Sequence, residues 1–111
     1  MDIKEYEKFV ESTSVYPAKG DLGGLIYTAL GLCGESGEVA EKVKKLLRDS
    51  DGNLTPEKRL EMLKELSDVA WYLTRMSAEL GSSLEEVFKI NMEKLLSRKA
   101  RGVLQGEGDN R

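Results

Sequence analysis

The stretch PEKRLEMLKELSDVAWYLTRMSAEL, Pro56 to Leu80, decides the fold class of this chain. Its apolar side chains recur every three or four residues, which is the repeat of one face of an α-helix. These residues are Met62, Leu66, Val69, Leu73, Met76 and Leu80. Thr55 stands at the N-cap position before a proline, and Gly81 is a typical helix stop. The sequence therefore predicts a helix from Pro56 to about Leu80.

Three other segments share this periodicity and bring the expected number of helices to four. They run over about Ile3–Ser12, Leu22–Arg48 and Leu84–Lys99. Asp21 is a candidate N-cap for the second, and Ser82 or Ser83 forms a capping box for the last with a glutamate three residues later. The two long helices are joined by the short turn DSDGN, so we expect them to pack antiparallel.

The expected fold class is all-α: an antiparallel helical bundle of about four helices, completed by homo-oligomerisation. A chain of 111 residues with 40 % hydrophobic content supports one core, so we expect a single domain over residues 1–102. The end of the chain, residues 103–111, is rich in glycine and charge and is expected to be a mobile tail. A bundle this small leaves its sides open to solvent, which favours a second subunit.

The chain contains no histidine, and this excludes every site that needs imidazole, including Ser-His-Asp and Cys-His catalysis. A net charge of −3 provides no basic surface for nucleic acid, so no nucleic-acid partner is expected. The apolar runs are too short to span a bilayer and the N-terminal MDIKEYEKFV is charged throughout, so we expect a cytoplasmic protein without a membrane partner. The one cysteine, Cys33, is expected to be a small core residue.

Two pairs of acidic residues lie beside the apolar stripes of the two long helices. Glu35 and Glu38 fall on one shoulder of the first stripe, and Glu65 and Asp68 fall on the same side of the second. Antiparallel packing would gather the four carboxylates, and a divalent cation would relieve their repulsion. Oxygen ligation without histidine or thiolate favours Mg²⁺ or Mn²⁺. The next glutamate, Glu41, falls on the solvent side, and we expect it to be solvated and paired with Lys45 one turn later.

Three glycines precede or separate these glutamates: Gly31, Gly34 and Gly37. Each costs a helix about 1 kcal/mol relative to alanine. We therefore expect them to keep space beside Glu35 and Glu38, either for a metal with its phosphates or for a close second helix.

Three polar residues lie on or beside the apolar face of the last expected helix: Asn91, Lys94 and Arg98. A lysine and an arginine at the edge of a core need an anion, which is either the carboxylates or a polyphosphate held through Mg²⁺. Taken separately, the acidic pairs and these cations also fit ordinary solvated helix faces. Their joint placement favours a site.

Three stretches in order, GLCGESGEVAEKVKK, KELSDVAWYL and INMEKLLSRKARG, resemble the MazG-like branch of the all-α nucleoside triphosphate pyrophosphohydrolases. The resemblance covers about Leu25 to Gly102. The family pattern is E-x-x-E on one helix, E-x-x-D on the next and N-x-x-K-x-x-x-R after them. Its positions are filled here by Glu35 and Glu38, by Glu65 and Asp68, and by Asn91, Lys94 and Arg98.

The resemblance implies hydrolysis of a nucleoside triphosphate between the α and β phosphates, giving a nucleoside monophosphate and pyrophosphate. It implies that the four carboxylates hold Mg²⁺, with Mn²⁺ as the alternative, and that Tyr72 and the three polar residues of the last helix bind substrate. Glu35 or Glu38 is the expected catalytic residue, which orients or deprotonates the attacking water. The expected partners are the substrate and further copies of the chain in a homodimer or homotetramer. The expected role is nucleotide-pool cleaning, and control of a signalling nucleotide stays open.

Two alternatives remain open. Within the same superfamily, the chain fits an enzyme with a fixed substrate, such as a dimeric dUTP hydrolase or a phosphoribosyl-ATP pyrophosphohydrolase. From another class, it fits a non-catalytic helical interaction module whose acidic shoulder only solubilises it. The segment SVYPAKGD, where base-contacting groups are expected, matches no specificity class and leaves the base open.

Overall fold

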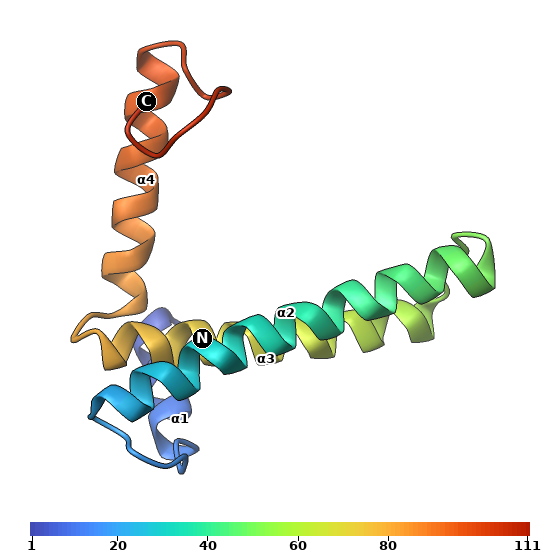
Figure 1. Cartoon of the computed structure of the whole chain (residues 1–111), viewed down its shortest axis with the longest axis horizontal. Helices are drawn as coiled ribbons and strands as arrows, with labels where there is room; N and C mark the ends of the chain where they lie inside the picture. Colours follow the sequence, from blue (N-terminus) through green and yellow to red (C-terminus); the bar gives the residue numbers. More distant parts are fainter.

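The computed structural model describes the whole chain, residues 1–111, and contains four α-helices and no strand. The helices are α1 (Ile3–Ser12), α2 (Leu22–Ser50), α3 (Pro56–Glu79) and α4 (Leu84–Ala100) (Figure 1). The all-α prediction is confirmed, and each predicted helix is present with ends that differ by two residues or fewer. No helix combines the length and the apolar composition that crossing a lipid bilayer requires.

Side chains cap two of the helices as the sequence predicts. Thr55 Oγ1 accepts the N–H of Lys58 at 3.2 Å, and Ser83 Oγ accepts the N–H of Glu86 at 3.2 Å. Asp21 occupies the N-cap position of α2, but its side chain makes no capping hydrogen bond, so that part of the prediction is wrong. The first turn of α2 is held through the backbone alone, because the carbonyl of Asp21 accepts the N–H of Gly24 at 3.0 Å.

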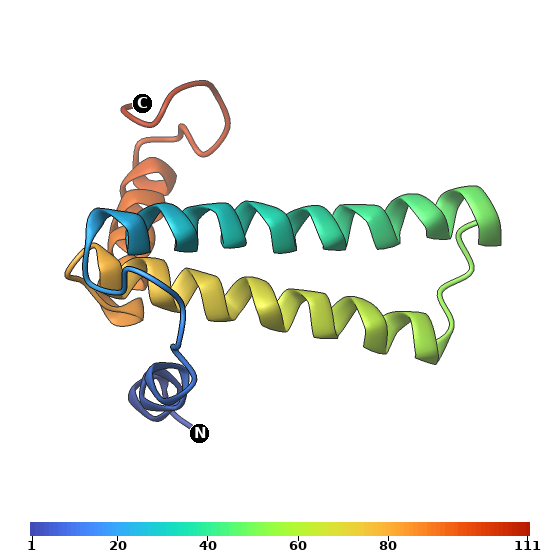
Figure 2. The same cartoon turned by 60° about the horizontal axis from the view of Figure 1, so that its bottom comes forward.

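Helices α2 and α3 form an antiparallel hairpin and lie side by side along their length (Figures 1 and 2). The turn between them begins at Asp51 and Gly52, which have φ values of 50° and 76°. This left-handed conformation cannot continue a right-handed helix, and aspartate and glycine tolerate it better than most residues. All four predicted metal ligands lie on the two helices of this hairpin.

Helix α1 crosses the end of the hairpin opposite this turn, and α4 leaves the same end and points away from both long helices (Figure 1). α4 contacts α1 and α3 but not α2. One chain therefore forms an antiparallel pair with two shorter helices at its end, and it does not close a four-helix bundle by itself.

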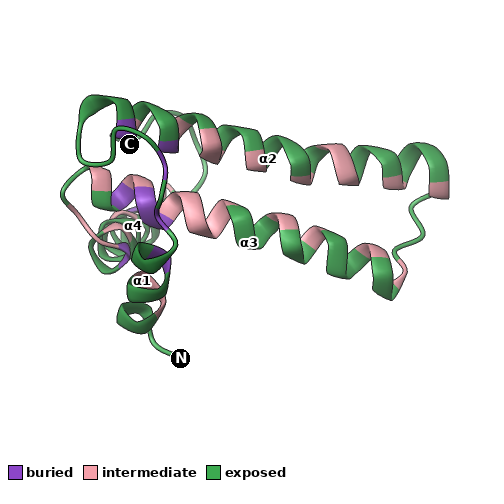
Figure 3. Ribbon diagram, turned by 90° about the horizontal axis from the view of Figure 1, so that it is seen from below, coloured by how far each residue is buried: buried purple, intermediate pink, exposed green.

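The core is small and lies where α1 and α4 meet the hairpin (Figure 3). Its buried apolar side chains are Val10, Tyr16 and Leu84. Along the rest of the hairpin the apolar residues are half-buried or exposed, and Leu66 is 49 % exposed. Cys33 is exposed, so its predicted place in the core is wrong: it lies on a face of α2 that no other helix covers.

The chain exposes more surface than a compact chain of its mass. Its accessible surface is 8018 Å², whereas a folded monomer of 12.4 kDa exposes about 6,100 Å². Its radius of gyration is 16.9 Å, against about 13 Å for a compact domain of this length. The excess of roughly 1,900 Å² comes from the open sides of the hairpin and from α4.

A polar network fixes the segment between α1 and α2 against α3. The buried Arg75 donates from Nε to the Tyr16 hydroxyl at 3.0 Å and pairs with Glu11. The same hydroxyl donates to Glu79, whose carboxylate also accepts the N–H of Gly20 at 3.1 Å. Burial, and then the carboxylate of Glu79, raise the pKa of Tyr16, so the phenol remains a donor at neutral pH. The network sets the ring of Tyr16 beside the hairpin.

Candidate metal centre

Three carboxylates from the two helices of the hairpin converge at one place. One oxygen from each of Glu35 on α2 and Glu65 and Asp68 on α3 lies within 4.8 Å of the others. Glu65 and Asp68 are three residues apart, so both project from one side of α3. Glu35 and Glu65 are half-buried, and Asp68 is exposed. The hairpin thus brings together three of the four residues that the sequence predicts as metal ligands, while Glu38 lies outside this group, exposed on α2.

The electrostatics of this cluster favour a bound cation. Burial raises the pKa of Glu35, and the charges of Asp68, Glu65 and Glu38 raise it further. A raised carboxyl pKa means that the surroundings disfavour the ionised form. Lys42 offsets part of the negative charge, because its Nζ lies 3.7 Å from Oε1 of Glu65. Carboxylate oxygens this close together fit a hard divalent cation, and its charge would remove their repulsion.

An open cavity of about 280 Å³ adjoins the carboxylates and is lined by Glu35, Asp68, Trp71 and Tyr72. The rings of Trp71 and Tyr72 meet edge to face with centroids 4.9 Å apart. Trp71 Nε1 donates to Thr13 Oγ1 at 2.8 Å, which fixes the indole. The cavity has a charged side that can hold a cation and an aromatic side against which a flat ring can pack.

Two further tyrosines lie beside Trp71 and Tyr72: Tyr16, from the segment SVYPAKGD where base-contacting groups are expected, and Tyr27, which sequence reasoning missed. Tyr16 comes from the segment between α1 and α2 and stacks on Tyr27 of α2, with centroids 5.1 Å apart and ring planes 8° from parallel. Tyr27 in turn lies 6.3 Å from Tyr72. The sequence indicated the segment of Tyr16 but not the direction of its ring, because a segment without periodicity does not reveal which way it faces.

The glycines around Glu35 have different surroundings. A Cβ added to Gly31 would lie 2.1 Å from the ring of Tyr72, so glycine lets α3 approach here. This confirms the expectation of a close second helix for Gly31. A Cβ on Gly34 or Gly37 would meet nothing within 4 Å. No group of the same chain packs closely against these two glycines.

Two of the predicted substrate-binding residues of α4, Lys94 and Arg98, contact the C-terminal tail rather than the carboxylates. Lys94 Nζ and Arg98 Nη2 each lie 3.6 Å from Oδ1 of Asp109. Arg98, whose side chain is 6 % exposed, also donates to the backbone carbonyl of Asp109 at 2.7 Å. Asn91 is exposed and lines a shallow cavity on α4. In this chain the anion beside Lys94 and Arg98 is therefore a tail carboxylate.

The tail, residues 103–111, folds back against α4 (Figure 1). Arg111 closes the loop by donating to the carbonyls of Val103 at 3.1 Å, Leu104 at 3.0 Å and Gly108 at 2.7 Å. No sequence motif indicated these contacts. The predicted mobility of the tail stays a prediction.

Glu41 behaves as its position on the helix predicts. It pairs with Lys44 at 2.8 Å and with Lys45 at 3.6 Å, on a surface where all three side chains are more than 40 % exposed. The predicted contact with Lys45 is confirmed. Glu41 is therefore a solvated residue outside the cluster.

Comparison with known proteins connects this site to a family. Residues 26–103 match the family described as the MazG nucleotide pyrophosphohydrolase domain. The chain is also 46 % identical over 114 residues to the Gene 37 protein of Mycobacterium phage L5, and the similarity covers the full length of both. No solved structure matches the chain. The family match spans both acidic pairs and the whole of α4, in agreement with the resemblance over Leu25 to Gly102. The chain therefore belongs to the MazG nucleotide pyrophosphohydrolase domain family.

Proposed function

We propose that this protein is a Mg²⁺-dependent nucleoside triphosphate pyrophosphohydrolase, which converts an NTP or dNTP to the monophosphate and pyrophosphate. The observation that carries the proposal is the group of Glu35, Glu65 and Asp68, with oxygens within 4.8 Å of one another in a chain of the MazG family. The repulsion among these carboxylates disfavours the ionised form of Glu35. A cation bound there would remove this repulsion, and this favours a metal site over a non-catalytic interaction module.

The residues present fit Mg²⁺, with Mn²⁺ as the alternative, since every donor is a carboxylate oxygen. Glu35, Glu65 and Asp68 would hold the ion, and Glu38 would join them or remain beside them. A bound divalent cation supplies charge neutralisation on the phosphate oxygens and on the leaving pyrophosphate.

The protein's own contribution to the hydrolytic step is to position a water and accept its proton. Glu35 or Glu38 orients the water in line with the bond between the α and β phosphates. The water oxygen bonds to the α phosphorus, its proton passes to the carboxylate, and the bond to the bridging oxygen of pyrophosphate breaks.

The aromatic side of the cavity suits the base or sugar of the nucleotide. Trp71 and Tyr72 line the cavity that Glu35 and Asp68 share, so a base packed against these rings leaves its phosphates near the carboxylates. Stacking on aromatic side chains is tolerant of base identity, because every base has a π face. We propose cleaning of the nucleotide pool as the biological role.

We also propose that the active form is a homodimer or homotetramer. A stripe on α2 is unpartnered in one chain, with exposed fractions of 72 % for Leu22, 52 % for Ile26 and 68 % for Leu30. The excess surface of roughly 1,900 Å² in one chain exceeds the roughly 800 Å² that each partner buries in a standard stable interface. A second copy would cover the stripe, and its α4 would be free to bring Lys94 and Arg98 toward the phosphates.

The test is a screen for pyrophosphate release from ribo-, deoxyribo- and damaged nucleoside triphosphates, with phosphoribosyl-ATP included, in the presence and absence of Mg²⁺. Glu38→Gln and Asp68→Asn should abolish most of the activity. Glu41→Gln is the matched control on the solvated face and should retain it. Full activity in Asp68→Asn would refute the site, and full activity in Glu38→Gln would leave Glu35 as the residue that positions the water. A cleaved substrate restricted to dUTP or phosphoribosyl-ATP would identify a fixed-substrate relative.

A further inference from the structure

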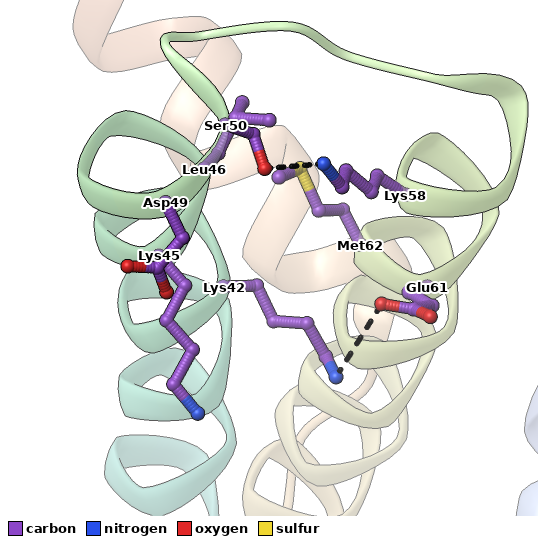
Figure 4. A pocket seen from close by; sticks show the side chains of 8 residues that line it. All are labelled: Lys42, Lys45, Leu46, Asp49, Ser50, Lys58, Glu61 and Met62. Carbon is purple, nitrogen blue, oxygen red and sulfur yellow. Dashed lines mark hydrogen bonds and ion pairs between the residues drawn. The ribbon is translucent and has the colours of Figure 1, made fainter.

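A second cavity, of about 350 Å³, lies between α2 and α3 near the turn of the hairpin (Figure 4). It is lined by Lys42, Lys45, Leu46, Asp49, Ser50, Lys58, Glu61 and Met62. Three of these side chains are lysines and two are carboxylates, so the lining carries a net positive charge.

The positive charge of the cavity is not neutralised by its own acidic residues. Asp49 is engaged by Arg48, which does not line the cavity, through two hydrogen bonds of 2.8 and 2.9 Å. Glu61 faces Lys42 at 3.9 Å. Lys58 has no carboxylate within 4 Å, and its ammonium donates to the hydroxyl of Ser50. An anion in the cavity would therefore meet a lysine without a charged partner.

Lys42 connects this cavity to the candidate metal centre. Its Nζ lies between Glu61, at 3.9 Å, and Glu65, at 3.7 Å, on successive turns of α3. From the C-terminal toward the N-terminal part of α3, the side chains that face these sites are first aromatic (Tyr72), then acidic (Asp68 and Glu65) and then basic (Lys58). At 1.5 Å per residue this row spans roughly 21 Å of helix. The lysine cavity and the aromatic cavity thus adjoin the carboxylates from opposite sides.

We propose that the lysine cavity is a binding site for pyrophosphate, both as the β and γ phosphates of a nucleoside triphosphate and as the released product. The inference rests on the proposed function and assigns a direction to the substrate: base at Tyr72, α phosphate at the carboxylates, terminal phosphates at Lys42 and Lys58. If the carboxylates held a cation, Lys42 would keep only Glu61 as its carboxylate partner, and its ammonium could donate to a phosphate oxygen.

The experiment is isothermal titration of the full-length protein with inorganic pyrophosphate, without and with Mg²⁺. Wild-type protein should bind pyrophosphate, and affinity should fall as salt is added. Lys42→Gln and Lys58→Gln should each weaken binding about tenfold, which is the effect of losing one charge-assisted contact. Lys44→Gln is the matched control, because it removes the same charge from α2 outside the cavity and should leave affinity unchanged. Thermal melting of each variant verifies that it is folded.

The outcomes separate this inference from the proposed function. Equal pyrophosphate affinity in Lys58→Gln and Lys44→Gln would overturn the lysine site, even if the protein hydrolyses nucleotides. No binding by the wild-type protein alongside Mg²⁺-dependent turnover would overturn it as well. Binding that depends on Lys42 and Lys58 in a protein without turnover would support the anion site while the proposed hydrolysis failed.

Discussion

Glu35→Gln should stabilise the metal-free protein, because it removes a charge from the cluster while keeping the shape of the side chain. The oxygens of Glu35, Glu65 and Asp68 lie within 4.8 Å of one another. One pair of unit charges at that separation repels by about 0.9 kcal/mol at the dielectric constant of water, the limit that suits this open site. Removal of two such pairs gives about 2 kcal/mol. For a chain of this length, the melting temperature should rise by about 7 to 9 °C.

The pH dependence of this gain follows from the direction of the pKa shift. The folded pKa of Glu35 is raised, first by burial and then by neighbouring charges, so the folded state binds a proton more tightly than the unfolded state. Wild-type stability therefore falls as pH rises from the ordinary carboxyl range through the raised pKa. The advantage of Glu35→Gln should be complete above the raised pKa and disappear below about pH 4.

The assay is thermal melting by circular dichroism at low ionic strength, with and without Mg²⁺. Mg²⁺ should raise the melting temperature of the wild-type protein, with a gain of about 2.7 kcal/mol at a concentration 100 times Kd, and should raise that of Glu35→Gln much less. Glu41→Gln is the control, since Glu41 is paired with lysines and should gain nothing from neutralisation. The reasoning is refuted if both variants respond alike, or if Glu35→Gln melts below the wild type in metal-free buffer.

Three further outcomes are expected. Arg75→Met leaves the buried carboxylate of Glu79 without its guanidinium partner, so the free energy of unfolding in urea should fall by about 3 kcal/mol. The double variant with Glu79→Gln should recover part of this loss, and an additive loss would contradict the stated cause. Gly31→Ala should cost about 1 to 3 kcal/mol because its Cβ overlaps a tyrosine ring, whereas Gly34→Ala should stabilise the helix by about 1 kcal/mol unless a second subunit packs there. Light scattering at micromolar concentration should show a dimer or tetramer that Leu30→Glu dissociates. A monomeric wild type would exclude a site to which a second subunit contributes α4.

The sequence by itself determined the helices. Their apolar repeats, the threonine cap before Pro56 and the glycine stop at Gly81 are local signals, and each acts through the few residues around it. The two acidic pairs were equally visible, because residues three apart on a helix share a face whatever surrounds them. The short turn after α2 then implied that those faces meet.

Only the tertiary structure decided which side chains from different helices approach one another. It placed Glu35 with Glu65 and Asp68 and left Glu38 outside, since contact across a hairpin depends on the relative rotation and offset of two helices. It turned α4 away from the hairpin and gave Arg98 a tail carboxylate as its partner. It also brought lysines from both helices to one cavity beside Glu65. Periodicity within a segment carries no information about such distances, because they are set by packing between segments that lie far apart in the sequence.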